Sequence, residues 1–213
     1  MKRKAYTIPL EKNPTIVMNV SPGHFTTSHF HLTHYLDLDD MKTNSSVARE
    51  VARELALPYL STTLVDTIVC MEGTEVIGAY MAEELLQEGK SVINSGRKIH
   101  VVTPINNVNR QLIFHSNTQE LIDERNVIVL VSSISSGITL KSALECLSYY
   151  NGKMVGVSAL FNAFPEKSEQ EIHSLFTSED IPEYKTFRPH KCEMCKAGRK
   201  LDAIIMPGGY TKI

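Results

Sequence analysis

The sequence has 213 residues, of which 42% are hydrophobic and 22% charged, values that are ordinary for a soluble globular protein. Its net charge of −2 and its pI of about 6.4 argue against a broad surface for nucleic acid or for an anionic membrane. No long apolar segment follows the basic N-terminus or occurs elsewhere, so we expect neither a secretory signal nor a membrane span. The cysteine pattern suits a reducing compartment, and we predict a cytoplasmic protein.

The N-terminal part of the chain predicts one strand and then a histidine-rich segment. Residues 15–20 form a β-branched apolar run, and four of the eight histidines lie within residues 24–34. His29, His31 and His34 have no Cys or Glu nearby, and their spacing matches no zinc pattern. The sequence therefore favours partly exposed strand histidines over a metal cluster.

An amphipathic helix is predicted over residues 44–57. Val47, Val51 and Leu55 recur at i, i+4 and i+8, and charged side chains occupy the opposite side. Pro58 ends the pattern, because a proline disfavours helical backbone in the residue before it.

A strand–loop–helix unit follows, with a buried strand over residues 66–71 and a helix over 76–88. In the loop between them, Gly73 and Thr74 offer backbone and hydroxyl donors to an anion. The neighbouring glutamates, Glu72 among them, would repel that anion unless they point away or meet a metal. A plain turn followed by a helix cap explains the same residues without any ligand.

The next stretch predicts a third strand over residues 91–94, followed by Arg97 and Lys98. Residues 99–110 carry few charges. They lead to a short strand over 111–114 and to a helical turn near residues 119–123.

The apolar run Val127–Val131 predicts a strand that is buried on both faces. A loop of small residues follows, and a helix begins near Thr139. Backbone N–H groups in such a loop, together with the N-terminal end of the helix, are typical of a phosphate-binding site. The same residues also fit a simple turn with Thr139 as a helix cap, and the residues alone do not separate the two interpretations.

Beyond this helix we expect a strand over residues 153–161 and a short helix over residues 169–176. The polar tail contains Cys192 and Cys195, with His190 two residues ahead of them. These three residues are one ligand short of a closed structural zinc site. We therefore assign no metal site and predict that folding needs no zinc.

The stretch from Asn126 to Leu140 resembles the signature of type I phosphoribosyltransferases. That signature has an apolar strand, two acidic residues, an apolar residue and then a Thr/Ser-Gly-x-Thr phosphate loop. The positions that agree with it are Val131, Ile134, Ser135, Ser136, Gly137 and Thr139. Ser132 and Ser133 stand where the two acids belong.

The resemblance implies an α/β fold with an open, mainly parallel sheet, helices on both faces and ligands at the carboxyl ends of the strands. It also implies roles for residues that match the family. The 5′-phosphate would be held by Ser135, Ser136, Gly137, Ile138 and Thr139. The ribose would contact Ser132 and Ser133. The pyrophosphate of phosphoribosyl pyrophosphate (PRPP) would contact Glu72, Gly73, Thr74, Arg97 and Lys98.

The flanking segments resemble, more loosely, the hood of orotate phosphoribosyltransferases. Phe25 and Tyr35 match aromatic hood positions near the base, whereas Ser28 and Phe30 replace the family's Lys and Gly. The Cys-x-x-Cys-Lys-x-Gly tail is also similar to that of such proteins. The resemblance implies a single domain over residues 1–213, in which residues 1–38 and 182–213 form the hood.

Two functions from different classes follow from this resemblance. The first is an enzyme, of the orotate phosphoribosyltransferase type or a relative, that transfers ribose 5-phosphate from PRPP to a nitrogenous base with the help of Mg²⁺. The second is a non-catalytic regulator that senses a ribose phosphate or a nucleotide on the same fold. The missing acids and the weakly charged 99–110 segment favour the second function. Either protein would be a homodimer that binds a PRPP-like or nucleotide-like small molecule, without nucleic acid or membrane partners.

Overall fold

The computed structural model describes residues 4–87, 92–109, 111–135, 137–163, 171–206 and 209–213. Its helices are α1 (Asp39–Thr43), α2 (Ser45–Ala56), η1 (Leu57–Tyr59), α3 (Glu75–Leu86), α4 (Ser116–Gln119), α5 (Ile138–Tyr149), η2 (Ser178–Asp180), η3 (Pro189–Lys191) and α6 (Glu193–Lys196). Its strands are β1 (Tyr6–Pro9), β2 (Val17–Thr26), β3 (His31–Asp37), β4 (Thr67–Cys70), β5 (His100–Val102), β6 (Ile105–Asn106), β7 (Leu112–Ile113), β8 (Asn126–Ile134), β9 (Lys153–Asn162), β10 (Ile172–Thr177), β11 (Thr186–Phe187), β12 (Ala203–Met206) and β13 (Gly209–Lys212).

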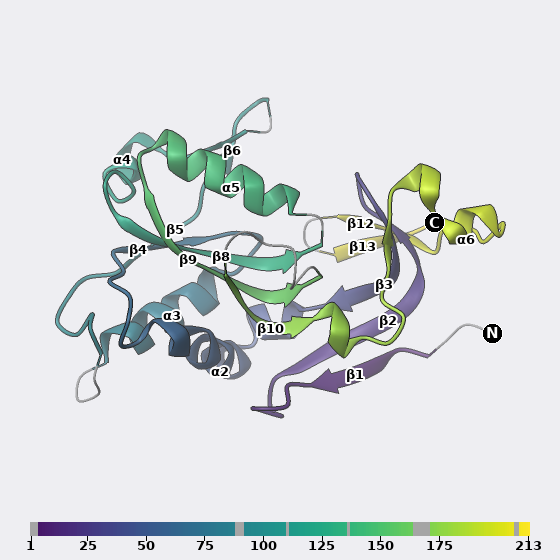
Figure 1. Cartoon of the computed structure of the whole chain (residues 1–213), viewed down its shortest axis with the longest axis horizontal. Coiled ribbons are helices and arrows are strands. Elements are labelled where there is room, and N and C mark those ends of the chain that lie inside the picture. Colours follow the sequence, from purple (N-terminus) through teal and green to yellow (C-terminus); the bar gives the residue numbers. More distant parts are fainter. Residues whose placement is uncertain (1–3, 88–91, 110, 136, 164–170, 207–208) are drawn as a thin grey trace.

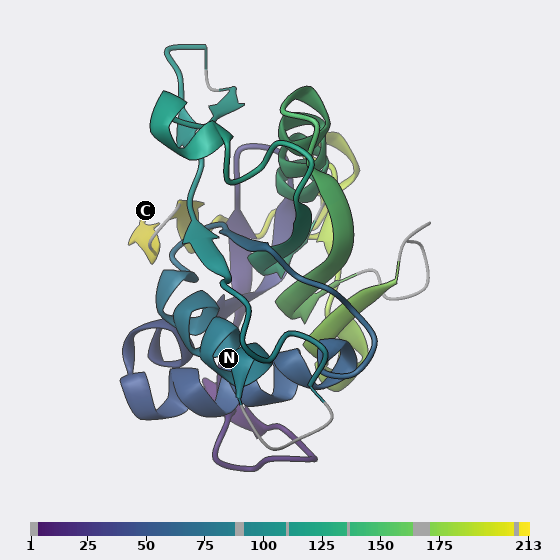
Figure 2. The same cartoon turned by 90° about the vertical axis from the view of Figure 1, so that its left-hand side faces the viewer.

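The first sheet is parallel throughout and has the strand order β10-β9-β8-β4-β5. Helix α5 lies on one face of this sheet, and α2 and α3 lie on the other (Figure 1). The view turned by 90° shows the same layers, with the sheet between the two groups of helices (Figure 2). The predicted open parallel sheet with helices on both faces is confirmed.

Strand β8 lies in the middle of this sheet and has no accessible surface between Val127 and Val131. Its alternate residues face opposite layers, as the period of two along a strand requires. Ile128 and Leu130 belong to the cluster that contains α2 and α3. Val129 and its neighbours at i±2 belong to the cluster beneath α5. Both faces of the central strand are therefore fixed by packing.

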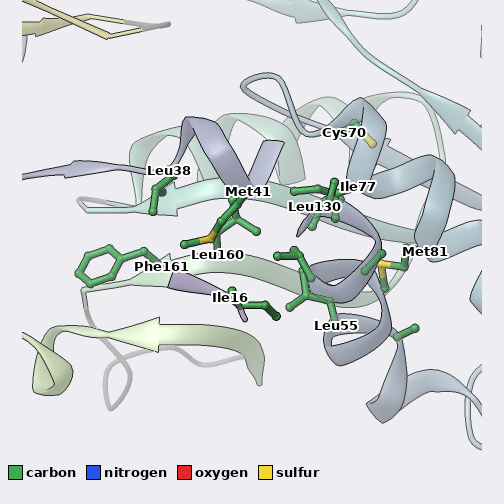
Figure 3. Packing of buried hydrophobic residues seen from close by; sticks show 14 of the residues in the cluster. Ile16, Leu38, Met41, Leu55, Cys70, Ile77, Met81, Leu130, Leu160 and Phe161 are labelled. Atoms are coloured by element: carbon green, nitrogen blue, oxygen red, sulfur yellow. The ribbon is translucent and has the colours of Figure 1, made fainter. Parts of the chain in front are cut away.

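The larger hydrophobic cluster lies between the sheet and the α2–α3 layer (Figure 3). Leu55 of α2 and Met81 of α3 are buried there together with Leu160 of β9. The Asn44 side chain caps α2 by accepting a hydrogen bond from the Ser46 N–H at 3.2 Å. The predicted amphipathic helix is thus present, and its apolar face is covered within the chain.

A second sheet is built from segments at both ends of the chain. Its order is β11-β3-β2-β12-β13, and β1 pairs with β2. Strand β12 runs parallel to β2, with Ala203 opposite Phe25. Figure 1 shows this sheet beside the carboxyl ends of β8, β9 and β10, so the two sheets meet at the edge where the phosphoribosyltransferase resemblance predicts ligands.

Two of the predicted elements differ from the structure. Residues 92–94 form a turn instead of the expected third strand, and Ser91 lies outside the described residues. The Asn94 side chain is buried in this turn, where it accepts a hydrogen bond from the Val65 N–H at 2.9 Å and donates one to the Thr63 carbonyl at 2.9 Å. A short helix was expected over residues 169–176; residues 169–170 lie outside the described residues, and residues 172–176 belong to β10. This strand pairs with β9 in parallel register, and this tertiary pairing outweighs the local helical pattern.

Within the described ranges, no helix combines the length and the apolar character that a membrane span requires.

Candidate functional site

A cleft of about 670 Å³ opens at the carboxyl ends of β4 and β8, between the two sheets. The arrowheads of β8 and β9 point toward the second sheet in Figure 1, so the loops that follow these strands face β2, β3 and β12. Among the predicted site residues, those that line the cleft are Tyr35, Glu72, Gly73, Ser132, Ser133, Ser135, Gly137, Ile138 and Thr139. The fold therefore gathers most of the predicted site in one place.

The β8–α5 loop carries the residues that were assigned to the 5′-phosphate. Gly137 precedes α5 with φ of 74° and ψ of −4°, a left-handed conformation that favours glycine. Among the described residues, and leaving aside its two chain neighbours, no atom lies within 4 Å of the position that a Cβ on Gly137 would occupy. The backbone is therefore open at the first turn of α5, where helix geometry leaves N–H groups without intrahelical partners. Ser136 lies outside the described residues.

The two serines that replace the family's acids lie at the end of β8. Ser132 is buried and Ser133 is half-buried, and both line the cleft. They bring hydroxyl groups to the place expected for the ribose, and they bring no charge.

The β4–α3 loop brings a carboxylate to the same place. Glu72 has φ of 59°, a rare conformation for a non-glycine residue. One of its carboxylate oxygens accepts a hydrogen bond from the Thr139 hydroxyl at 3.2 Å, and the other lies 3.5 Å from the Ser133 backbone nitrogen. The loop that was assigned to pyrophosphate thus contacts the loop that was assigned to phosphate.

The environment of Glu72 disfavours its negative charge. Desolvation raises the pKa of the Glu72 carboxyl above its ordinary value. The hydrogen bonds from Ser133 and Thr139 and the charge of Lys42 act in the opposite direction, and they do not cancel the effect of desolvation. The carboxyl therefore takes up a proton at a higher pH than an unperturbed glutamate does.

Thr74 has a structural part in this loop. It is fully buried, and its hydroxyl donates to the Met71 carbonyl at 2.9 Å, with the Leu130 carbonyl 3.2 Å away. This hydroxyl joins the end of β4 to β8 and does not line the cleft.

The aromatic side of the cleft comes from the second sheet and from the segment before β11. Tyr35 packs edge-on against Tyr210, with 4.7 Å between the ring centroids. Burial raises the pKa of the Tyr35 phenol to about 12, and the nearby Asp37 contributes to the shift. Phe25 lies 6.0 Å from the Tyr35 ring, in a small cluster outside the cleft lining. Of the two predicted base contacts, the structure brings only Tyr35 to the cleft.

The structure of the whole chain was compared with solved structures. UMP synthase of Leishmania donovani is similar with a TM-score of 0.54 and 20% identity, over 75% of this chain and 34% of that one. Orotate phosphoribosyltransferase of Mycobacterium tuberculosis gives a TM-score of 0.48 and 14% identity, over 70% and 80% of the two chains. Adenine phosphoribosyltransferase of Thermoanaerobacter pseudethanolicus gives 0.49 and 13%, over 81% and 94%.

The chain has the type I phosphoribosyltransferase fold. This assignment rests on the match to UMP synthase, of whose length the chain spans about a third. No protein-family model matches the sequence, and no curated protein matches it. The comparisons therefore establish the fold only, and the chemistry of the cleft follows from its own residues.

Two cationic residues assigned to pyrophosphate lie elsewhere in this phosphoribosyltransferase fold. Arg97 binds Asp66 at 2.9 Å, where β4 begins. Lys98 lines a small pocket at this same edge of the sheet, together with Asp66 and His100. Because residues 92–94 form no strand, Arg97 and Lys98 come just before the amino end of β5 and not after a strand. They are therefore at the opposite end of the sheet from the cleft.

The cleft is also lined by three residues that were not predicted from the sequence, namely Asp39, Lys42 and Tyr184. Lys42 forms an ion pair with Asp39 at 2.9 Å. Both residues belong to α1, a helix too short to predict from periodicity. Tyr184 forms a hydrogen bond with Ser135, while burial raises the pKa of its phenol to about 12. No sequence motif marks Tyr184, because only the tertiary fold brings it to the β8–α5 loop.

Among its described lining residues, the cleft offers few carboxylates as magnesium ligands. The carboxylates among its described lining residues are Asp39 and Glu72. Asp39 is paired with Lys42, and Glu72 accepts from Thr139. Mg²⁺ in proteins takes near-octahedral oxygen ligands that include carboxylates, waters and substrate phosphates, and both carboxylates here already have partners.

A different set of metal-ligating side chains lies in the second sheet. Among the described residues, His24, His31, Cys192 and Cys195 have ligand atoms that all lie within 4.8 Å of one another. From the sequence, His190 was the only histidine expected near the cysteines. This expectation is wrong, because His24 and His31 lie beside them. The fold supplies two histidines from the β2–β3 hairpin. His24, His31 and His34 are also buried, and not partly exposed as the sequence suggested.

Proposed function

We propose that this protein binds a phosphorylated ribose compound, either PRPP or a nucleotide, in the cleft between its two sheets. The 5′-phosphate would lie on the β8–α5 loop, at Ser135, Gly137, Ile138 and Thr139, with Ser136 completing the loop. The ribose would lie against Ser132 and Ser133.

The observation that carries this proposal is the geometry around Gly137. Its left-handed backbone turns the chain from β8 into α5, and open space lies where a side chain would be. A phosphate can therefore approach the backbone N–H donors and the positive end of the helix dipole closely. The Thr139 hydroxyl, 3.2 Å from the Glu72 carboxylate, shows that the loop already donates a hydrogen bond to an anionic group.

The remaining parts of the ligand are assigned by position. Gly73 lines the cleft beside the phosphate loop and is suited to a second phosphoryl group. Glu72 lies between the two loops, where it would have to move or take up a proton. Tyr35 offers a neutral aromatic face for stacking a base at the second sheet, with Phe25 behind it.

We favour binding without efficient transfer. Transfer would join a nitrogenous base to the ribose and release pyrophosphate from PRPP, so positive charge develops at the sugar. The serines at 132 and 133 place no negative charge there, and Arg97 and Lys98 are too far away to hold the pyrophosphate. Transfer of the orotate phosphoribosyltransferase type, with Mg²⁺ bound through the PRPP phosphates, is the second candidate. The phosphoribosyltransferase fold and the cleft favour it.

Calorimetric titration of the full chain tests the proposal. Ribose 5-phosphate, UMP and PRPP are titrated with and without Mg²⁺, and ribose without phosphate is the control. We expect binding of the phosphorylated compounds that depends little on Mg²⁺, and no binding of ribose. Failure of all three phosphorylated compounds to bind would overturn the proposal. Rapid release of pyrophosphate from PRPP and a base would select the enzyme instead.

A further inference from the structure

The metal-ligating cluster in the second sheet combines residues that are far apart in sequence. His24 lies in β2 and His31 begins β3, while Cys192 immediately precedes α6 and Cys195 lies within it. The Nε2 atom of His24 lies 3.1 Å from Nδ1 of His31, 3.4 Å from Sγ of Cys192 and 3.6 Å from Sγ of Cys195. Sγ of Cys195 lies 3.3 Å from Nδ1 of His31.

These four distances match four of the six edges of a zinc tetrahedron, and the other two lie within 4.8 Å. Zinc about 2.3 Å from each sulfur and about 2.0–2.1 Å from each nitrogen gives edges of about 3.3 Å between nitrogens and about 3.5 Å between nitrogen and sulfur. The observed values are 3.1 Å for the nitrogen pair and 3.3–3.6 Å for the mixed pairs. Two thiolates and two imidazoles form one of the common ligand sets of structural zinc.

The second contact of His24 sets which ring nitrogen is the ligand. Its Nδ1 lies 2.9 Å from the Arg199 carbonyl and 3.2 Å from the Lys200 carbonyl. A carbonyl oxygen only accepts, so Nδ1 carries the hydrogen and the lone pair of the neutral ring is on Nε2. This is the outer contact that metal-bound histidines usually make.

Hydrogen bonding alone accounts poorly for the cluster. The single lone pair on Nε2 of His24 faces three groups at once, the ring of His31 and the sulfurs of Cys192 and Cys195. One lone pair accepts one good hydrogen bond, and thiols are weak donors. A single cation at the centre would engage all four groups together.

The surrounding fold gives such a cation a structural task. The hydrophobic cluster on this part of the second sheet has only Phe25, Leu32 and Ala203 as buried members among the described residues. Because a core of this size contributes little stability, small structural units commonly rely on metals or disulfides. The histidine–cysteine cluster lies where the C-terminal segment meets the β2–β3 hairpin. At this junction the Asp202 carboxylate also accepts a hydrogen bond from the His24 backbone N–H at 2.8 Å.

We propose that the protein holds one structural zinc ion between His24, His31, Cys192 and Cys195. The ion joins the β2–β3 hairpin to α6 and the strand that follows it. The Thr27–Phe30 turn between the two histidines lines the cleft, so the ion also fixes one wall of the cleft.

The test uses the full chain, purified without a metal-affinity tag from cells supplied with zinc. Zinc per chain is measured by elemental analysis for the parent and for Cys195→Ser, whose exposed position tolerates the change. His190→Ala and His29→Ala are matched controls, because they change histidines of the same two segments that the geometry leaves outside the cluster.

We expect one zinc per chain in the parent and in both controls. In Cys195→Ser, zinc affinity should fall by more than the roughly 10–100-fold that loss of an outer contact costs. A strong chelator should lower the melting temperature of the parent and leave that of Cys195→Ser nearly unchanged. Protein that folds and melts identically with no bound metal, or zinc lost equally in His190→Ala, would overturn the proposal.

A second measurement covers the case in which the variant does not fold. Cobalt(II) is titrated into the metal-free parent, and a tetrahedral site with two thiolates gives visible absorption that saturates at one equivalent per chain. Thiol labelling of the parent should slow when the metal is bound. Absence of this absorption, or an intramolecular disulfide between Cys192 and Cys195 in the folded protein, would also contradict a zinc site.

Discussion

The Glu72 carboxylate accepts a hydrogen bond from the Thr139 hydroxyl, at 3.2 Å. Glu72 lies in the loop after β4, and Thr139 lies in the first turn of α5. An anionic side chain therefore occupies donors of the loop proposed to hold phosphate. A bound phosphate has to compete with this carboxylate, both for the hydroxyl and through charge repulsion.

The first prediction is that Glu72→Gln strengthens binding of ribose 5-phosphate. The amide keeps the size of the side chain and removes its charge. Two charges about 4 Å apart repel by about 1 kcal/mol in water and about 4 kcal/mol near a protein surface. We therefore expect the affinity to rise at least about fivefold. Calorimetry measures it, with Glu75→Gln as the control, because Glu75 begins α3 and does not line the cleft. Equal affinities in all three proteins would contradict a role for Glu72.

The advantage of Glu72→Gln should depend on pH. The pKa of Glu72 is raised, so its carboxyl becomes neutral at a higher pH than an ordinary glutamate. The difference in affinity between parent and variant should be largest at neutral pH and should shrink as the pH falls through this raised pKa.

The second prediction is that Gly137→Val abolishes phosphate binding and keeps the fold. A branched side chain in the left-handed conformation costs about 1–2 kcal/mol, and its bulk would fill the open space where the phosphate approaches. Gly96→Val is the control, because Gly96 has the same φ of 74°, equally open space and a place outside the cleft. Binding of ribose 5-phosphate by Gly137→Val as tight as by Gly96→Val would show that the phosphate lies elsewhere.

The third prediction concerns Asp66, which joins the starts of three strands. One of its oxygens accepts from the Arg97 guanidinium and the other from the Asn126 N–H, both at 2.9 Å. Burial raises the pKa of Asp66, but these hydrogen bonds and the charges of Arg97 and Arg125 together lower it more, so the net shift is downward. A depressed pKa stabilises the fold above the unfolded-state value of about 3.9, and the contribution is lost as the pH falls through the folded-state value.

Asp66→Asn should therefore lower the free energy of unfolding by about 1–2 kcal/mol at neutral pH. The difference from the parent should decrease below about pH 4. Urea unfolding at several pH values measures it. Glu145→Gln, a surface carboxylate 3.7 Å from Lys141, is the control and should change stability by less than about 0.5 kcal/mol. A loss in Asp66→Asn that is independent of pH would refute the electrostatic explanation.

The fourth prediction is a homodimer in solution. Helix α2 buries its apolar face against α3 within the chain and therefore offers no apolar interface. The β6–β7 hairpin is the better candidate, since Val108 in its turn is 99% exposed and Ile105 of β6 is 37% exposed. Light scattering at micromolar concentration should give about twice the chain mass of 23.9 kDa. Val108→Asp should shift this mass toward the monomer if the segment is the interface.

The parallel sheet and the left-handed turn that leads into α5 were predictable because their signals are local. A continuous apolar run from Val127 to Val131 has to be buried on both faces, and Gly137 permits the left-handed turn that starts α5. The predicted positions of Arg97 and Lys98 were wrong because the strand expected before them is absent. The expected strand over residues 91–94 would have put them at a carboxyl end, whereas β5 begins only at His100.

The histidine–cysteine cluster could not be predicted from the sequence, because its residues are far apart along the chain. The two residues of the β2–β3 hairpin approach each other through strand pairing, and Cys192 and Cys195 come from a segment more than 160 residues later. A search for nearby ligands stops at His190. Only the packing of the C-terminal segment against β2 brings His24 into contact with the cysteines.

The last prediction concerns Ser132 and Ser133. If these residues stand where the family's two acids do, Ser132→Asp with Ser133→Asp should create Mg²⁺-dependent binding of PRPP. A charge-assisted hydrogen bond to a ribose hydroxyl contributes about 1.5–3 kcal/mol, and a neutral one about 1 kcal/mol. Two replacements together should strengthen binding about ten- to several-hundred-fold in the presence of Mg²⁺.

Without Mg²⁺ the same double variant should bind PRPP more weakly than the parent. Its new carboxylates would lie beside Glu72, which approaches the Ser133 N–H at 3.5 Å, and all three would repel the ligand. Ser132→Asn with Ser133→Asn is the control, because it adds the same bulk without charge. Calorimetry with and without Mg²⁺ separates the cases. If the double aspartate and double asparagine variants respond equally to Mg²⁺, the alignment of this loop with the phosphoribosyltransferase signature is wrong.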